Sequence, residues 1–310
     1  MDFATVEKAR AAFHAKRQNI YKKGGIVLLF VVLGALFLRV NGIMSVFFIF
    51  FLAFFTFVIT TIIASFATAK DYEAYKKAYK TYFVASSLNN VFTNIHYEHQ
   101  SGFPKQTVAA VMSTADRYSS NDLLTATYKN ISFTQADVHT EERHTTTDSN
   151  GQTHTYYETI FKGRFLIFDF NRNFSFSLQV SSKGFTGEVL PRSASERKFQ
   201  RITTESGDFN RKFYVYAQDG VDALYILDPA FMEKIQQLYE DCRHDLLLTF
   251  MDKKVYIAID DHEDSFEPPA RISQPLNKQA ELAKIQQDIK VITNFVDSLK
   301  LDRYFKGVAK

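Results

Sequence analysis

The sequence predicts an α+β protein: an N-terminal two-helix transmembrane hairpin, followed by a soluble domain with a mainly antiparallel sheet and flanking helices. Three observations predict this class. Two apolar runs, residues 24–40 and 43–67, are separated only by a short polar stretch. Segments with strand character, bounded by turn residues, follow from residue 122. One amphipathic helical pattern lies between these strand segments, and a second follows the last of them.

Each apolar run is long enough to cross a membrane, because roughly 20 residues at about 1.5 Å each span a hydrocarbon core of about 30 Å. One continuous helix would place Arg39, Asn41 and Gly42 in lipid, where a charge costs at least a few kcal/mol. A hairpin with its tip at Asn41 and Gly42 puts all three in water, and Asn-Gly favours a turn. We therefore expect residues 24–68 to form a transmembrane hairpin in contact with the lipid bilayer. A soluble helical hairpin would need polar faces that both runs lack, and a signal peptide would need a cleavage site that is absent after the first run.

Basic residues near the two runs predict the orientation. Six lysines and arginines precede the first run, Arg39 at the end of that run is the only one near the turn, and four lysines follow the second run within residues 70–80. By the positive-inside rule, both termini face the cytoplasm.

Two helical segments flank the predicted hairpin. Residues 1–23 form a basic amphipathic cytoplasmic segment that we expect to lie at the membrane interface; the alternative is a weakly helical leader in solution. Residues 69–93 form a helical stalk, and residues 94–310 the soluble α+β domain. The stalk carries an aromatic stripe that packs inward on the domain or, as the alternative, contacts a partner. The stripe comprises Tyr72, Tyr75, Tyr79, Tyr82 and Phe83.

In the soluble domain, we expect a long hairpin over residues 131–171 with a polar tip at 147–152, because alternating strand patterns flank that tip. Further strands are expected at residues 174–180, 212–218 and 222–227, and another hairpin at 246–260. Asp228 followed by Pro229 predicts a capped helix that runs to Cys242.

The C-terminal helix carries an apolar heptad seam. The pattern is shorter than the three to four heptads that indicate a coiled coil, so we expect the helix to pack on the sheet. The alternative is a homo-oligomer formed through this seam. The seam comprises Leu282, Ile285, Ile289, Ile292, Val296 and Leu299.

Composition excludes several classes. The chain has 37 Lys and Arg against 34 Asp and Glu, and the excess lies before the first apolar run. The soluble region is therefore near neutral, which argues against nucleic-acid binding. One cysteine, Cys242, excludes an internal disulfide and a cysteine-based zinc site. Its place on a helical pattern favours a small buried apolar residue over a nucleophile.

Three blocks occur in the order of one family pattern: FKGRFLIFDFNRNF at 161–174, FNRKFYVYAQDGVDALYILDPAFMEKIQQL at 209–238, and LLLTFMDKKVYIAIDDHEDSFEP at 246–268. They resemble bacterial membrane-anchored proteins known only as a domain of unknown function, with F-K-G, D-F-N, V-Y and F-E-P blocks. Leu224 stands where that family tends to have arginine, and Asp228 where it has threonine. The resemblance implies a membrane-anchored α+β domain in the bacterial cytoplasmic membrane, without an established reaction.

Clusters of polar residues are weak candidates for chemistry. The histidines and acids of the hairpin, among them His144 and His154, are interpreted as a solvated tip, with a shared metal as the alternative. The acids at 260–264 are interpreted as an exposed loop, with a hard cation as the alternative. Asp169, at the end of a buried strand, is the best single acid or base candidate; the alternative is that it satisfies backbone donors of the following turn. We assign no catalytic residue, metal or cofactor.

These observations favour a non-enzymatic, membrane-tethered cytoplasmic domain that binds a protein partner or organises other proteins, with Tyr72, Tyr75, Tyr79 and Tyr82 as candidate contacts. The first alternative is an unrecognised hydrolase acting near the membrane, which requires a pocket where Asp169 or the 260–264 acids converge with a histidine. The second is a small-solute pore formed by oligomerised hairpins. The apolar runs contain few polar groups that could line such a pore.

Overall fold

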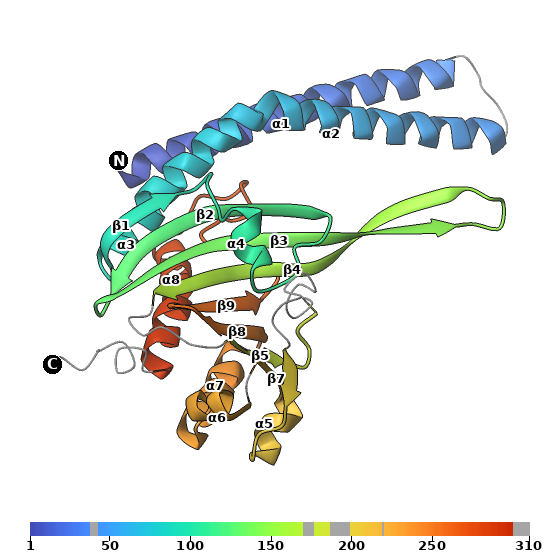
Figure 1. Ribbon diagram of the computed structural model, residues 1–310. Helices are drawn as coiled ribbons and strands as arrows, with labels where there is room; N and C mark the ends of the chain where they lie inside the picture. Colours follow the sequence, from blue (N-terminus) through green and yellow to red (C-terminus); the bar gives the residue numbers. More distant parts are fainter. Residues whose placement is uncertain (38–42, 170–176, 187–198, 219, 300–310) are drawn as a thin grey trace. The chain divides into compact units, whose positions relative to one another are not determined.

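The computed structural model describes residues 1–37, 43–169, 177–186, 199–218 and 220–299 (Figure 1). The predicted turn at Asn41 and Gly42, Arg39, and the turn after Asp169 lie outside these residues. The chain divides into two compact units. Met1–Ser86 with Glu267–Leu282 forms the helical unit, and Ser87–Phe266 with Ala283–Lys310 forms the sheet unit.

In the helical unit, α1 (Phe3–Phe37) and α2 (Ile43–Tyr79) run side by side in opposite directions (Figure 1). The rings of Phe13 and Tyr72 lie 5.2 Å apart. Further along the pair, a Cβ on Gly24 would lie 2.5 Å from Oγ1 of Thr60. Glycine therefore permits the two helix backbones to approach closely at this level.

The helix that contains α2 ends in a π-helical turn, Lys80–Val84, followed by α3 (Ala85–Asn89). Residues 267–282 of the same unit contact both long helices. Lys80 pairs with Glu267, Tyr79 donates its hydroxyl to Glu281 at 2.7 Å, and the Leu276 N–H donates to Glu7 at 2.6 Å. This C-terminal segment thus fixes the ends of α1 and α2 that lie away from residues 38–42.

The N-terminal part of α1 packs on protein along its apolar side. Val6 and Phe13, on the apolar side of this part of α1, are buried, and Phe13 packs on Tyr72 of α2. Because α2 is helical beyond the apolar run, it offers the apolar side of α1 a protein surface. The placement of this segment at the membrane interface remains a prediction. Phe3 likewise lies 6.1 Å from Tyr82.

Among the described residues, one helix, within Phe47–Asn89, is long and apolar enough to cross a membrane by length and composition. The two-helix transmembrane hairpin is therefore only half supported by this criterion.

The sheet unit contains a nine-stranded sheet in the order β1-β2-β3-β4-β9-β8-β5-β7-β6. All its strand pairs are antiparallel, which confirms the predicted α+β class and its mainly antiparallel sheet. The strands are β1 (Thr93–Glu98), β2 (Arg117–Tyr128), β3 (Ile131–Thr147), β4 (Thr153–Asp169), β5 (Leu178–Ser182), β6 (Gln200–Ile202), β7 (Phe213–Ala217), β8 (Asp245–Met251) and β9 (Lys254–Asp260).

Apolar side chains of the central strands form a core on each face of the sheet. On one face Ala136, Phe165 and Ala258 are neighbours in register and belong to a buried cluster with Val108 and Met112. The latter two lie in and just after α4 (Lys105–Ala109). On the other face, the register neighbours are buried as well, as expected for a central strand. They are Leu166 and Ile257, with the buried polar side chain of Gln135 beside Leu166.

The remaining helices are α5 (Gly207–Lys212), α6 (Gly220–Ile226), α7 (Pro229–Cys242) and α8 (Lys278–Ser298). The cap of α7 is confirmed, because Oδ1 of Asp228 accepts from Phe231 N at 2.7 Å. The strand expected at 222–227 is wrong, because this segment is α6. Ala223 and Leu227, four residues apart, are both buried, and the Leu227 N–H donates to Ala223 O. That spacing fits a helical face better than a pleat.

Candidate binding pocket

The sheet unit contains an open pocket of about 690 Å³. Its walls come from β4, the loop after β9, the end of α7 and one side of α8. Polar and charged side chains dominate the lining, including Arg164, Cys242, His244, Asp261, Glu263 and Asp288. Such a concave surface, with several polar groups directed to one space, is the usual form of a ligand site.

Arg164 of β4 is the central charged residue of the pocket. Its side chain is 4% exposed. Nη2 donates to Oδ1 of Asp288 at 2.9 Å, and Nη1 donates to the Asp288 carbonyl at 3.3 Å. Nε lies 3.0 Å from Oδ2 of Asp261, an ion pair without hydrogen-bond angles. One guanidinium thus joins β4, α8 and the loop after β9.

The residue before Arg164 explains how the loop reaches it. A Cβ on Gly163 would lie 2.1 Å from the Ile259 carbonyl and 2.8 Å from Oδ1 of Asp261. Real Cβ atoms do not approach backbone so closely, so only glycine permits this contact between β4 and the chain leaving β9. The glycine therefore lets Asp261 reach Arg164.

Burial shapes the titration of the pocket. It raises the pKa of both Asp261 and Asp288, and the Arg164 charge opposes that rise. Burial also raises the pKa of the Cys242 thiol to about 11. The thiol is therefore protonated near neutral pH, which argues against Cys242 as a nucleophile, since the thiolate is the reactive form.

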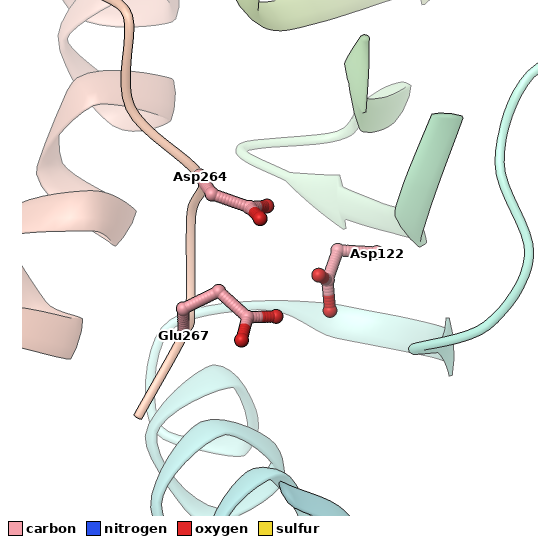
Figure 2. Close-up of side chains that lie close together, drawn as sticks. All are labelled: Asp122, Asp264 and Glu267. Atoms are coloured by element: carbon pink, nitrogen blue, oxygen red, sulfur yellow. The ribbon is translucent and has the colours of Figure 1, made fainter. Parts of the chain in front are cut away.

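A second group of acids lies where residues 264–265, in the loop after β9, meet β2 and β3. Asn121 Nδ2 donates to Oδ2 of Asp122 at 2.8 Å and to Oδ1 of Asp264 at 3.1 Å, so one amide bridges the two carboxylates. Figure 2 shows these two carboxylates. The Asp137 carboxylate accepts from both N–H and hydroxyl of Ser265. These bonds attach residues 264–265 to β2 and β3.

The predicted tyrosine stripe is divided by the structure. Tyr75 and Tyr79 are completely buried, so they offer no surface to a partner. Tyr72 and Tyr82 are half-buried, and each packs on a phenylalanine of α1. A partner contact remains a prediction only for these two.

Asp169 does not meet the expectation of a buried acid. It lies at the end of β4, opposite Lys254, and is exposed. The next residues, 170–176, lie outside the described part of the chain, so the prediction that Asp169 accepts hydrogen bonds from the following turn is untested. As an acid or base candidate it loses its physical basis, because burial was the reason for choosing it.

The histidines of the hairpin lie apart from each other in register. His144 faces Tyr156 and His154 faces Thr146. Each has its own carboxylate: His144 lies 3.2 Å from Glu158, and His154 lies 3.3 Å from Asp148. This arrangement agrees with the predicted solvated tip.

The acidic loop was predicted to be exposed, but the side chains of Asp260 and Asp261 are only 8% and 6% exposed. Asp261 pairs with Arg164. His262 and Glu263 are exposed as predicted. Arg164 itself was missed, although an arginine inside the apolar stretch of β4 was the available signal.

The C-terminal heptad side chains are buried from Ile285 to Leu299, so α8 packs within the protein. They leave no exposed seam there for a second copy; Leu282, at the start of the pattern, is half-buried.

Fold and pocket together define an α+β domain joined to a long helix pair that includes one helix able to cross a membrane. Residues 159–301 match a family described as "Protein of unknown function (DUF3137)". The resemblance to an uncharacterised family is therefore confirmed over this range. No curated protein matches the chain. Among solved structures, the chain is similar to the crystal structure of the mycobacterial trehalose monomycolate transport factor A, TtfA, at 10% identity and a TM-score of 0.37. That match covers 72% of this chain and 93% of the other, and at this score it assigns neither fold nor function.

Proposed function

We propose that this protein is a membrane-tethered binding domain, held in the bacterial cytoplasmic membrane by a two-span hairpin, with both termini in the cytoplasm. The carrying observation is a belt of exposed apolar side chains on both long helices. Water-soluble proteins seldom expose contiguous apolar surface on this scale, which marks membrane or protein contact. On α1 the belt comprises Ile26, Val27, Leu29, Phe30 and Leu33. On α2 it comprises Phe47, Phe48, Phe50, Phe51, Phe54, Phe55, Phe57, Ile59, Ile62, Ile63 and Phe66.

The pairing of α1 and α2 supports the proposed orientation. Lys16 of α1 lies 2.6 Å from Asp71 of α2, so the basic segments before the first run and after the second lie at the same end of the helix pair. The apolar belt occupies the remainder. A cluster of lysines and arginines beside the membrane is typical of the cytoplasmic side.

The pocket supports binding over catalysis. Arg164 is paired with both Asp261 and Asp288, and the Cys242 thiol is protonated, so these buried groups act in structure and not as free reactive groups. Tethering would raise the local concentration of whatever the domain binds, as linkage does for any second binding event.

A membrane-proximal hydrolase is the second candidate, because His244 lines the same pocket as Asp261 and Glu263. Such an enzyme would need His244 as base or acid. Activity towards membrane-derived esters that is present in the wild type and lost in His244→Ala would favour it over the binding role.

Photo-crosslinking from the pocket tests the binding role. A photoreactive residue at Gln287, on the exposed pocket wall, is expected to give one discrete adduct in intact membranes. The same residue at Arg211, exposed on α5, is the control and should give none. Equal adducts at both positions, or none at Gln287, would count against a ligand or partner in this pocket.

A further inference from the structure

The ends of β3 and β4 form a two-stranded ribbon that extends beyond the other strands (Figure 1). β2 follows β3 only as far as Glu141, and β9 follows β4 only from Arg164. Within the described residues, no third strand pairs with positions 142–147 or 153–159. Both edges of the ribbon can therefore accept a further strand. A third strand would stabilise the ribbon, since two strands alone in water are only marginally stable.

The outer edge of β4 presents backbone groups in a defined register. At the tip, the Asp148 N–H donates to Gln152 O at 2.9 Å, which places the backbone groups of these two residues between the strands. Inward and outward groups alternate along an antiparallel strand. The N–H and C=O groups of Thr155 and Tyr157 therefore point outward, whereas those of Tyr156 point to β3. Positions 153–159 contain neither lysine nor proline, two residues that commonly protect an exposed edge.

We propose that two copies of the protein associate through this edge, β4 against β4, antiparallel about a two-fold axis at Tyr156. Tyr156 then faces Tyr156 of the second copy in a non-hydrogen-bonded pair. Thr155 and Tyr157 exchange backbone hydrogen bonds on either side of the axis. The interface is isologous, the form that closed dimers use.

The side chains of this edge are complementary to themselves in that register. His154, Tyr156 and Glu158 alternate onto one face of the ribbon. Tyr156 is 50% exposed and its ring stacks on His144 at 5.2 Å, which holds it on that face. Two-fold pairing at Tyr156 sets an aromatic pair at the centre, flanked by a His154–Glu158 pair on each side. Aromatic pairs are among the cross-strand neighbours that stabilise sheets, and an imidazole can hydrogen-bond a carboxylate that faces it.

Other registers lose this complementarity. An axis at Tyr157 would place Glu158 against Tyr156, and an axis at Thr155 would place His154 against Tyr156. In both registers His154 and Glu158 no longer face each other. The occupant is therefore a second copy in one register, and α2 would confine two copies to the same bilayer, which favours their encounter.

Cysteine crosslinking in membranes tests the register. In a Cys242→Ser background, Tyr156→Cys should form a disulfide-linked dimer under mild oxidation, because facing Cα atoms of such a pair lie about 4.5 Å apart. His154→Cys alone and Glu158→Cys alone should not, because each lies about 13 Å along the strand from its own counterpart. The two single variants expressed together should crosslink. A dimer from His154→Cys alone, or none from Tyr156→Cys, would overturn the proposal.

The mass of the full chain in detergent gives an independent test. The wild type should have twice the 35.7 kDa protein mass of one chain. Tyr156→Lys, which sets two ammonium groups at the axis, should have the mass of one chain with an unchanged thermal midpoint. Thr145→Lys, on the outer edge of β3, is the matched control and should remain dimeric. A monomeric wild type, or loss of the dimer in both variants, would contradict pairing through β4.

Discussion

Arg164 of β4 and Asp288 of α8 form a buried ion pair, with Nη2 2.9 Å from Oδ1, across 124 residues of sequence. Asp261 lies against the same guanidinium. Removing one partner of a buried charge cluster leaves the others without compensation, which is far more costly than losing a surface pair. This relationship links the pocket to the stability of the sheet unit.

Arg164→Met should lower the free energy of unfolding by about 3 to 5 kcal/mol, because it leaves two buried carboxylates unpaired. The free energy of unfolding of Arg164→Lys should lie between those of the wild type and Arg164→Met, because an ammonium keeps the charge without the planar fork of the guanidinium. Urea denaturation of the full chain in detergent measures this. Arg211→Met, at an exposed pair on α5, is the matched control and should resemble the wild type. An equal loss of free energy of unfolding in Arg164→Met and Arg211→Met would show that the buried cluster stabilises the protein no more than an exposed pair does.

Gly163→Ala should destabilise the protein by about 1 to 3 kcal/mol, the usual cost of overpacking, because its Cβ would meet the Ile259 carbonyl. Gly207→Ala, where a Cβ meets nothing within 4 Å, is the control. Thermal unfolding of both variants checks this. A Gly163→Ala protein as stable as Gly207→Ala would mean that β4 and the loop after β9 are not in close contact.

Asp228→Ala should lower stability by about 0.5 to 2 kcal/mol, because Phe231 N loses its acceptor at the start of α7. Asp228→Thr should be close to the wild type, since threonine also caps helices. The same denaturation experiment separates them. If Asp228→Thr lowered stability as much as Asp228→Ala, position 228 would require the carboxylate charge and not the helix cap.

Asp137→Asn should flatten the dependence of stability on pH. Burial, and then the charge of Asp122, raise the pKa of Asp137 well above its usual range. Above about pH 4 the unfolded chain loses this proton while the folded chain retains it. The folded state then binds more protons, so stability falls as pH rises from about 4 through the folded pKa.

The free energy of unfolding measured across that pH range should therefore fall less steeply in Asp137→Asn than in the wild type. Asp208→Asn, on exposed α5, is the control and should keep the wild-type slope. Parallel curves for all three proteins would show that Asp137 titrates in the folded state as it does in the unfolded chain.

Local signals in the sequence predicted local structure. The Asp228–Pro229 cap, the hairpin tip at 147–152 and the turn of the β8–β9 hairpin each depend on a few adjacent residues, and the structure contains all three. Short elements such as β6 and α5 carry too few residues for a periodic pattern. Segment 222–227 was assigned to the wrong class, because a six-residue apolar pattern fits both a strand and a helical turn.

The pocket could not be predicted in the same way. Arg164 acquires its role from Asp261 and Asp288, which the fold brings from distant positions. Asp169 and Asp261 both follow strands of similar apolar character, yet only Asp261 has a buried cation beside it. Sequence pattern locates a strand end, but the identity of the group packed against it depends on tertiary structure.

Cysteine labelling tests the proposed anchor most directly. In a Cys242→Ser background, single cysteines are placed at Ala4, Gly42 or Asn150 and treated with a membrane-impermeant maleimide in intact cells. The two-span hairpin predicts labelling at Gly42 only, with Ala4 and Asn150 labelled after permeabilisation. Labelling at both Ala4 and Gly42 would indicate a single span through α2, and labelling at Asn150 in intact cells would place the sheet unit outside the cytoplasm; either result would contradict the account.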